Sequence, residues 1–259
     1  MSEPILLCED RDGIRTLTLN NPAARNALSG TMMALLHEAF VAAAAEPAVR
    51  VVILAANGPA FCAGHDLKEM RGNSDPVFHA RLMDQCVALM LAIVRCPKPV
   101  IARVHAIATA AGCQLVASCD LAVAADSAHF ATPGVNIGLF CSTPMVALSR
   151  NLGPKHAMEM LLIGDLVNAH DAWRMGLLNR VVEAGQLDAS VAEFAQRIAS
   201  KSSHTLAVGK EAFYAQAEMS LEEAYRHCAA VMVRNMQAND AREGIDAFIQ
   251  KRPACWQDS

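Results

Sequence analysis

The chain alternates between short apolar runs and longer segments in which apolar residues recur with helical spacing. Residues Ile14 to Leu19 alternate β-forming and polar side chains and then meet an Asn-Asn-Pro turn, a pattern typical of a strand. Ser29 predicts the N-cap of a helix that reaches about Glu46. The apolar run from Arg50 to Ala55 is bounded by an Asn-Gly-Pro turn and therefore predicts a buried strand.

The middle of the chain continues this succession of helices and strands. Helical spacing extends from about Pro76 to Arg95, and two prolines then separate it from a strand predicted at Val100 to Val104. The uncharged, small-residue segment from Ala108 to Ser118 predicts a tightly packed buried helix that is entered from a loop. A strand over Asp120 to Ala125 and a short one around Phe130 are expected next.

The last part of the chain is predominantly helical. The stretch from Ala131 to Pro144 holds two glycines and two prolines, so we expect an irregular loop of the kind that often carries function. From Pro154 onward the pattern is helical, and no strand is predicted between Lys201 and Lys251. Helix capping signals occur at Asn168, Asp188 and Ser220. We therefore expect an α/β body of strand-strand-helix repeats over residues 1–200 and a helical part over residues 201–259.

Composition narrows the class of protein further. With 259 residues, 53% of them hydrophobic and 19% charged, the chain is a folded globular protein rather than a disordered or coiled-coil one. A formal net charge of -4 and an aromatic content of 5% argue against a nucleic-acid partner. The purely apolar runs stay far short of the roughly 20 residues that a membrane span needs, so we expect no membrane association.

The nine cysteines form no CxxC pair and no zinc-ligand spacing. We therefore expect reduced thiols and no metal site. The first residues lack the features of a secretory signal or a transit peptide, and a cytoplasmic location is the expectation that follows.

Two segments share an arrangement that suits chemistry on an anion. Each has a strand and a small-residue loop that opens a helix: RVVILAANGPAFCAGHDLKEM and PVIARVHAIATAAGCQLVASCD. The first backbone N–H groups of a helix are unpaired and carry the positive end of its dipole, so two such helix starts facing each other would bind an anion. Gly64 and Gly112 lack a Cβ and would let a ligand approach the backbone closely.

These segments resemble the crotonase (enoyl-CoA hydratase/isomerase) superfamily, and the resemblance runs from Arg25-Asn26-Ala27-Leu28 to Phe248-Ile249-Gln250-Lys251. The motifs GHDLKE, ATAAGCQLVASCD and PGVNIGLFCSTP are most similar to the branch of enoyl-CoA hydratase domain-containing proteins. The resemblance implies an α/β crotonase (ClpP-like) spiral of ββα repeats. It also implies that the helical C-terminal region mediates assembly into a homotrimer or a dimer of trimers.

The resemblance further implies an acyl-CoA thioester as substrate and an enolate stabilised by two backbone N–H groups, those of His65 and Ala111. No separate cofactor is expected, because coenzyme A enters as part of the substrate. The substrate and CoA-binding positions that the resemblance implies are Ala24, Arg25, Ala63, His65, Asp66, Leu67, Gly112, Gly134, Phe248 and Lys251. Two of these have a simpler interpretation, Asp66 as a helix N-cap and Lys251 as a solvated charge at a helix end.

The acid and base of the hydratases are replaced in this sequence. Where that family places its two glutamates, this chain has Gln114 and Gly134, neither of which can take a proton from water. His65 and Cys141 are the candidates for a substitute, against the simpler interpretations that the His65 ring contacts Asp66 or solvent and that Cys141 bonds the backbone of its loop. We expect an acyl-CoA-processing enzyme that hydrates poorly, or alternatively a non-catalytic acyl-CoA-binding or regulatory protein.

Overall fold

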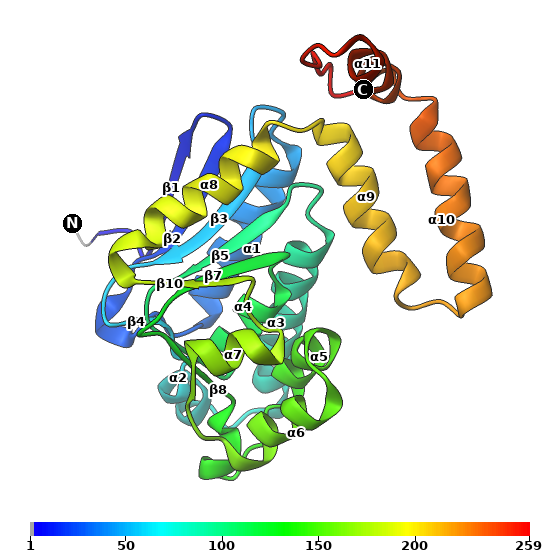
Figure 1. Cartoon of the computed structure of the whole chain (residues 1–259). Helices are drawn as coiled ribbons and strands as arrows, with labels where there is room; N and C mark the ends of the chain where they lie inside the picture. Colours follow the sequence, from blue (N-terminus) through cyan, green and yellow to red (C-terminus); the bar gives the residue numbers. More distant parts are fainter. Residues whose placement is uncertain (1–2) are drawn as a thin grey trace.

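The computed structural model describes residues 3–259 and contains two sheets surrounded by helices (Figure 1). The larger sheet has the strand order β1-β2-β3-β5-β7-β10; β1 runs antiparallel to β2 and the other neighbours are parallel. Its strands are β1 (Leu6–Arg11), β2 (Ile14–Leu19), β3 (Val51–Ala56), β5 (Val100–Val104), β7 (Leu121–Ala125) and β10 (Arg180–Val182). Parallel strands require crossovers, and helices supply them.

Helices cover both faces of this sheet, which explains why its central strands read as continuous apolar runs. All six residues of β3 are buried. Val51, Ile53 and Ala55 pack on one face against α8 (Leu187–Ala199), while their alternate neighbours join the main core with α1 (Gly30–Ala45). Figure 1 shows α8 and α1 on opposite sides of the sheet.

The main core also holds two helices that position the candidate site, α3 (Pro76–Arg95) and α4 (Ala111–Ser118). All eight residues of α4 are buried. By length and composition α3 is apolar enough to cross a membrane, yet five of its residues, including Leu82 and Cys86, are buried in the protein core. One side of α3 therefore belongs to the core, while apolar residues such as Val77 and Val87 remain exposed.

The smaller sheet has the order β4-β6-β8-β9. Its strands are β4 (Ala60–Cys62), β6 (Ile107–Thr109), β8 (His129–Ala131) and β9 (Val167–Asn168). The remaining helices are η1 (Pro22–Ala24), α2 (Leu67–Gly72), η2 (Pro133–Ile137), α5 (Ser142–Asn151), α6 (Pro154–Ile163), α7 (Ala169–Met175), η3 (Ala184–Gln186), α9 (Ser203–Gln216), α10 (Leu221–Met236) and α11 (Asn239–Gln250).

Most elements expected from the sequence are confirmed within one or two residues. Ser29 caps α1 by accepting a hydrogen bond from the Met32 amide, Asn168 caps α7 in the same way, and Ser220 forms a capping box with Glu223. After residue 200 the described chain is helical, as expected.

Four expectations were wrong. Strands β1, β4, β9 and β10 were not predicted; β1 is an edge strand with mainly exposed side chains and the others have only two or three residues. Ala108 and Thr109 belong to a strand rather than to the following helix. Asp188 lies inside the first turn of α8 and does not cap it. The expected irregular loop ends early, because α5 begins at Ser142.

The C-terminal helices extend beyond the edge of the large sheet, with α10 standing away from it and α11 at the far end (Figure 1). Lys210 of α9 ties them to the body through a 2.6 Å ion pair with Asp120. The chain end returns as well, since Asp258 pairs with Arg50 at 2.6 Å. The division at residue 200 into two domains stays a prediction.

Candidate active site

The two strand-loop-helix segments leave the small sheet side by side. β4 and β6 are parallel, with Cys62 opposite Ala108, so the loops that follow both strands emerge at the same edge. The hydroxyl of Thr109 donates to the carbonyl of Ala63 at 3.1 Å and links these loops. The sequence therefore places the starts of α2 and α4 next to each other, as the two-helix-start prediction requires.

The backbone amides of His65 and Ala111 are both free to bind a ligand. Within residues 3–259 neither amide donates a hydrogen bond. A Cβ added to Gly64 would lie 3.2 Å from the Ala111 nitrogen, which places the residue before His65 directly against that amide. Ala110 has φ 50° and ψ -120°, a conformation that costs energy for a non-glycine residue and directs the Ala111 amide.

Gly112 is required by the close approach of α4 to β4. A Cβ at this position would lie 2.1 Å from the carbonyl oxygen of Cys62. Only glycine permits that approach, so Gly112 holds the start of α4 on the strand that leads to His65.

The segment from Ala24 to Leu28 completes the wall beside His65. Ala63 donates its amide to the Arg25 carbonyl at 3.1 Å, and Leu28 donates to the Gly64 carbonyl at 2.8 Å. The fully buried Asn26 side chain fixes this segment by donating to the carbonyls of Asn57 and Ala60. Ala24, Arg25 and residues 63–67 are thus brought together, as the family resemblance implied.

The two carboxylates nearest this wall are occupied as helix caps. Asp66 Oδ1 accepts hydrogen bonds from the amides of Lys68 and Glu69, which confirms its interpretation as the N-cap of α2. Glu69 Oε2 accepts from the Gly30 amide at 2.9 Å and so serves the start of α1. Neither is placed as a base.

The His65 ring is shielded from solvent at Nε2, and this atom has no hydrogen-bond partner within residues 3–259. Within residues 3–259 the ring makes no hydrogen bond with Asp66, and since His65 is only half-buried, the interpretation that the ring contacts solvent stays open. Burial lowers the pKa of His65, so the imidazole is neutral at pH 7.

Gln114 lies on the first turns of α4 with only 5% of its surface exposed. Its Oε1 has one weak contact, with the Cys86 thiol at 3.9 Å. Its Nε2 donates to no other group in the described chain. The Ala131 carbonyl accepts from the Ala110 amide. The hydroxyl of the next residue, Thr132, is fully buried and has no hydrogen-bond partner within residues 3–259. Unpaired polar groups are rare in protein interiors, and those near a ligand site indicate polar ligand atoms.

The backbone of the following loop fills the space beside Gly134. A Cβ there would lie 2.7 Å from the Leu139 carbonyl oxygen and 2.9 Å from the Cys141 sulfur. Burial raises the pKa of the Cys141 thiol, and burial with the nearby Cys141 raises that of Cys113 to about 12. Both residues are therefore protonated thiols at neutral pH.

Phe248 and Lys251 are not brought to the other candidate residues within one chain. They lie on α11 and at its C-cap, at the opposite end of the molecule from α2 (Figure 1). Phe248 is 86% exposed and Lys251 is exposed. A role for them at the site would therefore need a second copy of the chain.

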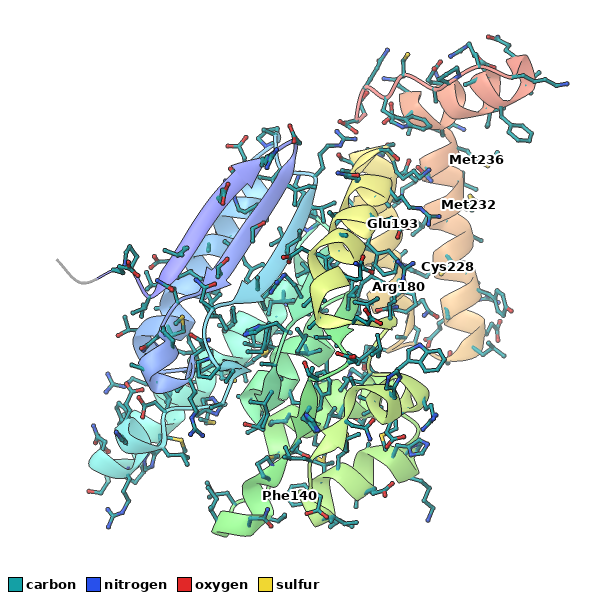
Figure 2. The ribbon with its side chains drawn as sticks, turned by 60° about the vertical axis from the view of Figure 1, so that its left-hand side comes forward. Phe140, Arg180, Glu193, Cys228, Met232 and Met236 are labelled. Atoms are coloured by element: carbon teal, nitrogen blue, oxygen red, sulfur yellow. The ribbon has the colours of Figure 1, made fainter. Side chains whose placement is uncertain are left out.

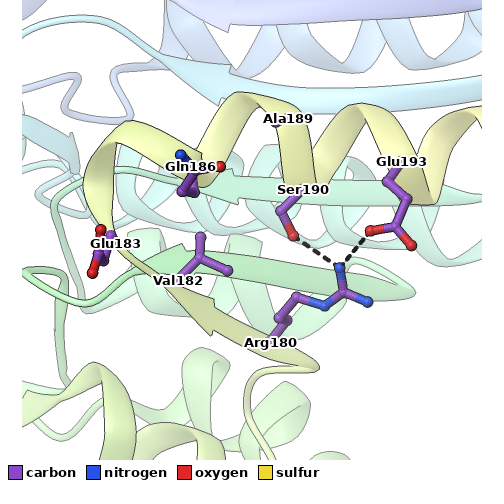
Figure 3. Close-up of a pocket in the computed structure, with 7 residues that line it drawn as sticks. All are labelled: Arg180, Val182, Glu183, Gln186, Ala189, Ser190 and Glu193. Atoms are coloured by element: carbon purple, nitrogen blue, oxygen red, sulfur yellow. Dashed lines mark hydrogen bonds and ion pairs between the residues drawn. The ribbon is translucent and has the colours of Figure 1, made fainter.

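Surface cavities within residues 3–259 include two that neither His65 nor Ala111 lines. One of 430 Å³ lies between β10 and α8, where Arg180 donates to Ser190 and Glu193 (Figure 3). The other, of 310 Å³, lies between the start of α1, α2 and α3, and Glu69 and Leu82 line it. Within residues 3–259 no group of three His, Cys, Asp or Glu residues is placed to hold a metal ion.

Comparison with known proteins shows the family of this chain. The family model "Enoyl-CoA hydratase/isomerase" matches residues 9–259. The "Enoyl-CoA hydratase domain-containing protein 3, mitochondrial" of Rattus norvegicus is 46% identical over 98% of this chain and 85% of its own length. The human protein of that name is 46% identical over 95% of this chain and 81% of its own length. Both names give a mitochondrial location, which differs from the cytoplasmic one expected here, and the location of this chain stays a prediction.

Solved structures confirm the crotonase fold. An enoyl-CoA hydratase from Mycobacterium smegmatis superposes with a TM-score of 0.96 at 53% identity, over 98% of this chain and 99% of the other. Human enoyl Coenzyme A hydratase domain-containing protein 3 superposes with a TM-score of 0.95 at 44% identity, over 98% and 100% of the two chains. The chain therefore belongs to the enoyl-CoA hydratase/isomerase family and has the crotonase fold.

Proposed function

We propose that the protein binds an acyl-CoA thioester and stabilises its enolate with the backbone amides of His65 and Ala111. The single observation that carries this proposal is that both amides are unpaired within residues 3–259, while Gly64, which precedes His65, packs against the Ala111 amide. Fixed amides aimed at a developing oxyanion contribute about 3–4 kcal/mol each in comparable sites. Ala24, Arg25 and residues 63–67 form the adjoining wall, where the CoA part of the substrate binds.

Efficient hydration is not part of this proposal. Gln114 and Gly134 stand where the hydratases place glutamates, Asp66 and Glu69 are occupied as caps, and Cys141 is a protonated thiol. A general base typically contributes ~10²–10⁴ in rate, so its loss leaves a slow hydratase. Chemistry that needs only enolate stabilisation remains available to this site, with His65 or Cys141 as the proton-carrying group.

The same observations favour a second candidate function, a protein that binds acyl-CoA without turning it over. The oxyanion hole consists of backbone groups, which persist when catalytic side chains are lost. In this case CoA thioesters bind but no product forms.

We further propose that the functional form is a homotrimer or a dimer of trimers. An exposed apolar row follows one side of α10, with Tyr225 73% and Met232 60% exposed, and Figure 2 shows Cys228, Met232 and Met236 along the same helix. The remote position of Phe248 and Lys251 supports a neighbouring copy as the one whose CoA they contact.

The test compares butanoyl-CoA with S-butyl-CoA, a thioether that lacks only the carbonyl oxygen. Calorimetric titration should show the thioester binding at least tenfold more tightly, because only its oxygen can accept from two amides. Infrared spectroscopy with a ¹³C-labelled thioester should show a carbonyl stretch shifted to lower frequency on binding.

Equal affinities for the thioester and the thioether, with an unshifted carbonyl stretch, would show that the two amides do not donate hydrogen bonds to the thioester carbonyl. Turnover of crotonyl-CoA, followed in parallel, separates the two candidate functions. Slow hydration that Gln114→Glu accelerates indicates an enzyme, whereas binding without any product indicates a binding protein.

A further inference from the structure

We infer that Ala110 is a positioning residue for the proposed oxyanion site. Its methyl group sets the spacing between the two helix starts and keeps the Ala111 amide directed at the ligand, at the expense of the stability of the folded chain. The inference rests on the proposed binding of a thioester carbonyl by the amides of His65 and Ala111. It adds a residue that acts through these amides rather than through contact with the substrate.

The first step concerns the backbone conformation of Ala110. Its φ of 50° and ψ of -120° lie outside the regions that residues with a side chain favour. A residue in such a conformation lowers the stability of a folded protein and persists only where its surroundings fix it. Glycine, which has no Cβ, adopts a positive φ freely. An alanine at this position therefore needs a reason that a glycine would not.

Two hydrogen bonds fix Ala110 in this conformation. Its amide donates to the Ala131 carbonyl of β8 at 2.9 Å, and its carbonyl accepts from the Gln114 amide of α4 at 3.0 Å. In a trans peptide unit the C=O and N–H bonds point in opposite directions. Because the Ala110 carbonyl points into α4, the Ala111 amide of the same peptide unit points out of the helix start. The backbone of Ala110 thus determines the direction of this amide.

The methyl group of Ala110 lies between the two helix starts. A Cβ added to Gly64 would lie 2.8 Å from the Ala110 Cβ, so this methyl group already fills the space beside Gly64 that a side chain would take. Gly64 directly precedes His65. The methyl contact therefore joins the segment that carries one amide to the segment that carries the other, one residue closer to both amides than the hydrogen bond from Thr109 to Ala63.

The two properties of Ala110 act in opposite directions. Its positive φ lowers the stability of the folded protein, whereas its methyl group restricts the peptide unit that carries the Ala111 amide. A glycine at this position would remove the strain, but it would also let the peptide unit rotate, because glycine populates more backbone conformations than alanine. Donors that must be oriented during binding contribute less than donors that are fixed beforehand. Stability and carbonyl recognition should therefore change in opposite senses when the methyl group is removed.

The experiment compares Ala110→Gly with the natural protein. Removal of the strain should raise the midpoint of thermal unfolding by about 2–4 °C. In calorimetric titration the preference for butanoyl-CoA over S-butyl-CoA should fall by about threefold to tenfold, because the Ala111 amide is less fixed. The infrared carbonyl stretch of the bound ¹³C-labelled thioester should move back toward that of the free ligand and broaden.

Two further variants serve as controls. Ala110→Ser keeps a Cβ at the same place, so it should retain both the unfolding midpoint and the ligand preference of the natural protein. Ala189→Gly removes a methyl group from an exposed position within α8. It should lower the midpoint, as glycine does inside a helix, and leave the ligand preference unchanged. Opposite shifts of the midpoint in the two glycine variants would show that the strain is specific to position 110.

The outcomes separate this inference from the proposed function. If Ala110→Gly keeps the full preference for the thioester, or if Ala110→Ser loses it as well, the methyl group does not position the amides, while carbonyl binding stands. A midpoint that falls in Ala110→Gly as it does in Ala189→Gly would also overturn the inference, because it would show that Ala110 is not strained. If the natural protein itself does not prefer the thioester, the proposed function fails and this inference fails with it.

Discussion

At the scale of single residues, the packing around position 134 restricts which side chains can stand there. The Leu139 amide donates to the Gly134 carbonyl at 2.9 Å, and the loop so closed passes over the space that a side chain at 134 would need. A carboxylate side chain therefore cannot be introduced at position 134 unless the loop moves, because the loop occupies the space it would need.

We predict that Gly134→Ala lowers the free energy of unfolding by about 1–3 kcal/mol, since its Cβ would overlap the Leu139 carbonyl oxygen. Urea denaturation measures the loss. Gly209→Ala is the control, because a Cβ at that position in α9 meets nothing within 4 Å and the change should be neutral or stabilising. Equal stabilities for the natural protein and Gly134→Ala would show that the loop moves freely.

His65 gives the second residue-scale prediction, on the pH dependence of stability. Burial lowers its pKa in the folded protein, whereas the unfolded chain titrates near the usual value of about 6.5. Below about pH 6.5, His65 therefore binds a proton in the unfolded state but not in the folded state. The free energy of unfolding falls as the pH decreases for this reason.

His65→Ala keeps the backbone amide and removes this loss of stability at acidic pH. The free energy of unfolding should then depend less steeply on pH between about pH 7 and 5.5, by up to about 1.4 kcal/mol per pH unit. His156→Ala is the control, because its side chain is 50% exposed. An unchanged slope in His65→Ala would mean that the ring is hydrated in the folded protein.

The sequence could predict those features of the site that depend on local chain geometry. Asp66 as a cap and the pair of neighbouring helix starts follow from a strand, a small-residue loop and a helix start, whereas the two amides at 65 and 111 were implied by the family resemblance. The occupation of Glu69 by the Gly30 amide could not be predicted, because these residues are 39 positions apart. The left-handed φ of Ala110 could not be predicted either, since nothing in an alanine signals a strained backbone.

At the scale of secondary structure elements, the predicted strands are either buried on both faces, as β3 and β5 are, or alternate between apolar and polar residues, as β2 does. β3 and β5 read as apolar runs because α8 covers one face and the main core the other. The missed strands have either exposed side chains, as β1 does, or too few residues to show a period. Their strand conformation comes from pairing with a neighbour rather than from their own sequence.

Helix α9 is held to the body by a buried polar cluster. Lys210 Nζ donates to Asp120 Oδ2 at 2.6 Å and to two backbone carbonyls, and Tyr214 donates to Asp120 Oδ1 at 2.9 Å. The Lys210 side chain is 8% exposed and that of Asp120 is 17% exposed. Burial and the adjacent Asp120 carboxylate raise the pKa of Tyr214, so it remains a donor at all ordinary pH values.

Lys210→Met should therefore lower the free energy of unfolding by about 3–5 kcal/mol, because it leaves the Asp120 charge buried without its cation. Urea denaturation measures this loss. The double variant Lys210→Met with Asp120→Asn should lose less than the sum of the two single changes. Strict additivity of the two losses would mean that the pair is hydrated and does not anchor α9.

At the scale of the whole molecule, the C-terminal helices are long, but few of their residues are buried. On α10 the residues Leu221, Tyr225, Met232 and Met236 are spaced along one side, and each is more than half exposed. Exposed apolar rows of this kind mark protein interfaces. The family resemblance predicted assembly through this region, and the row supplies a specific surface for it.

In the proposed trimer or dimer of trimers, Met232→Glu places a charge in the middle of that row. Light scattering should then give the mass of a single chain, against that of three or six chains for the natural protein. Val41→Glu on α1, where the valine is 52% exposed, is the matched control and should leave the mass unchanged. The monomeric variant should also bind butanoyl-CoA less tightly, because α11, which carries Phe248 and ends at Lys251, lies at the opposite end of the molecule from α2 and would contact the ligand of a neighbouring copy. If the monomer keeps full affinity, the CoA site lies within one chain and Phe248 and Lys251 take no part in binding. If the variant loses both its assembly and its affinity, each site is completed by a neighbouring copy.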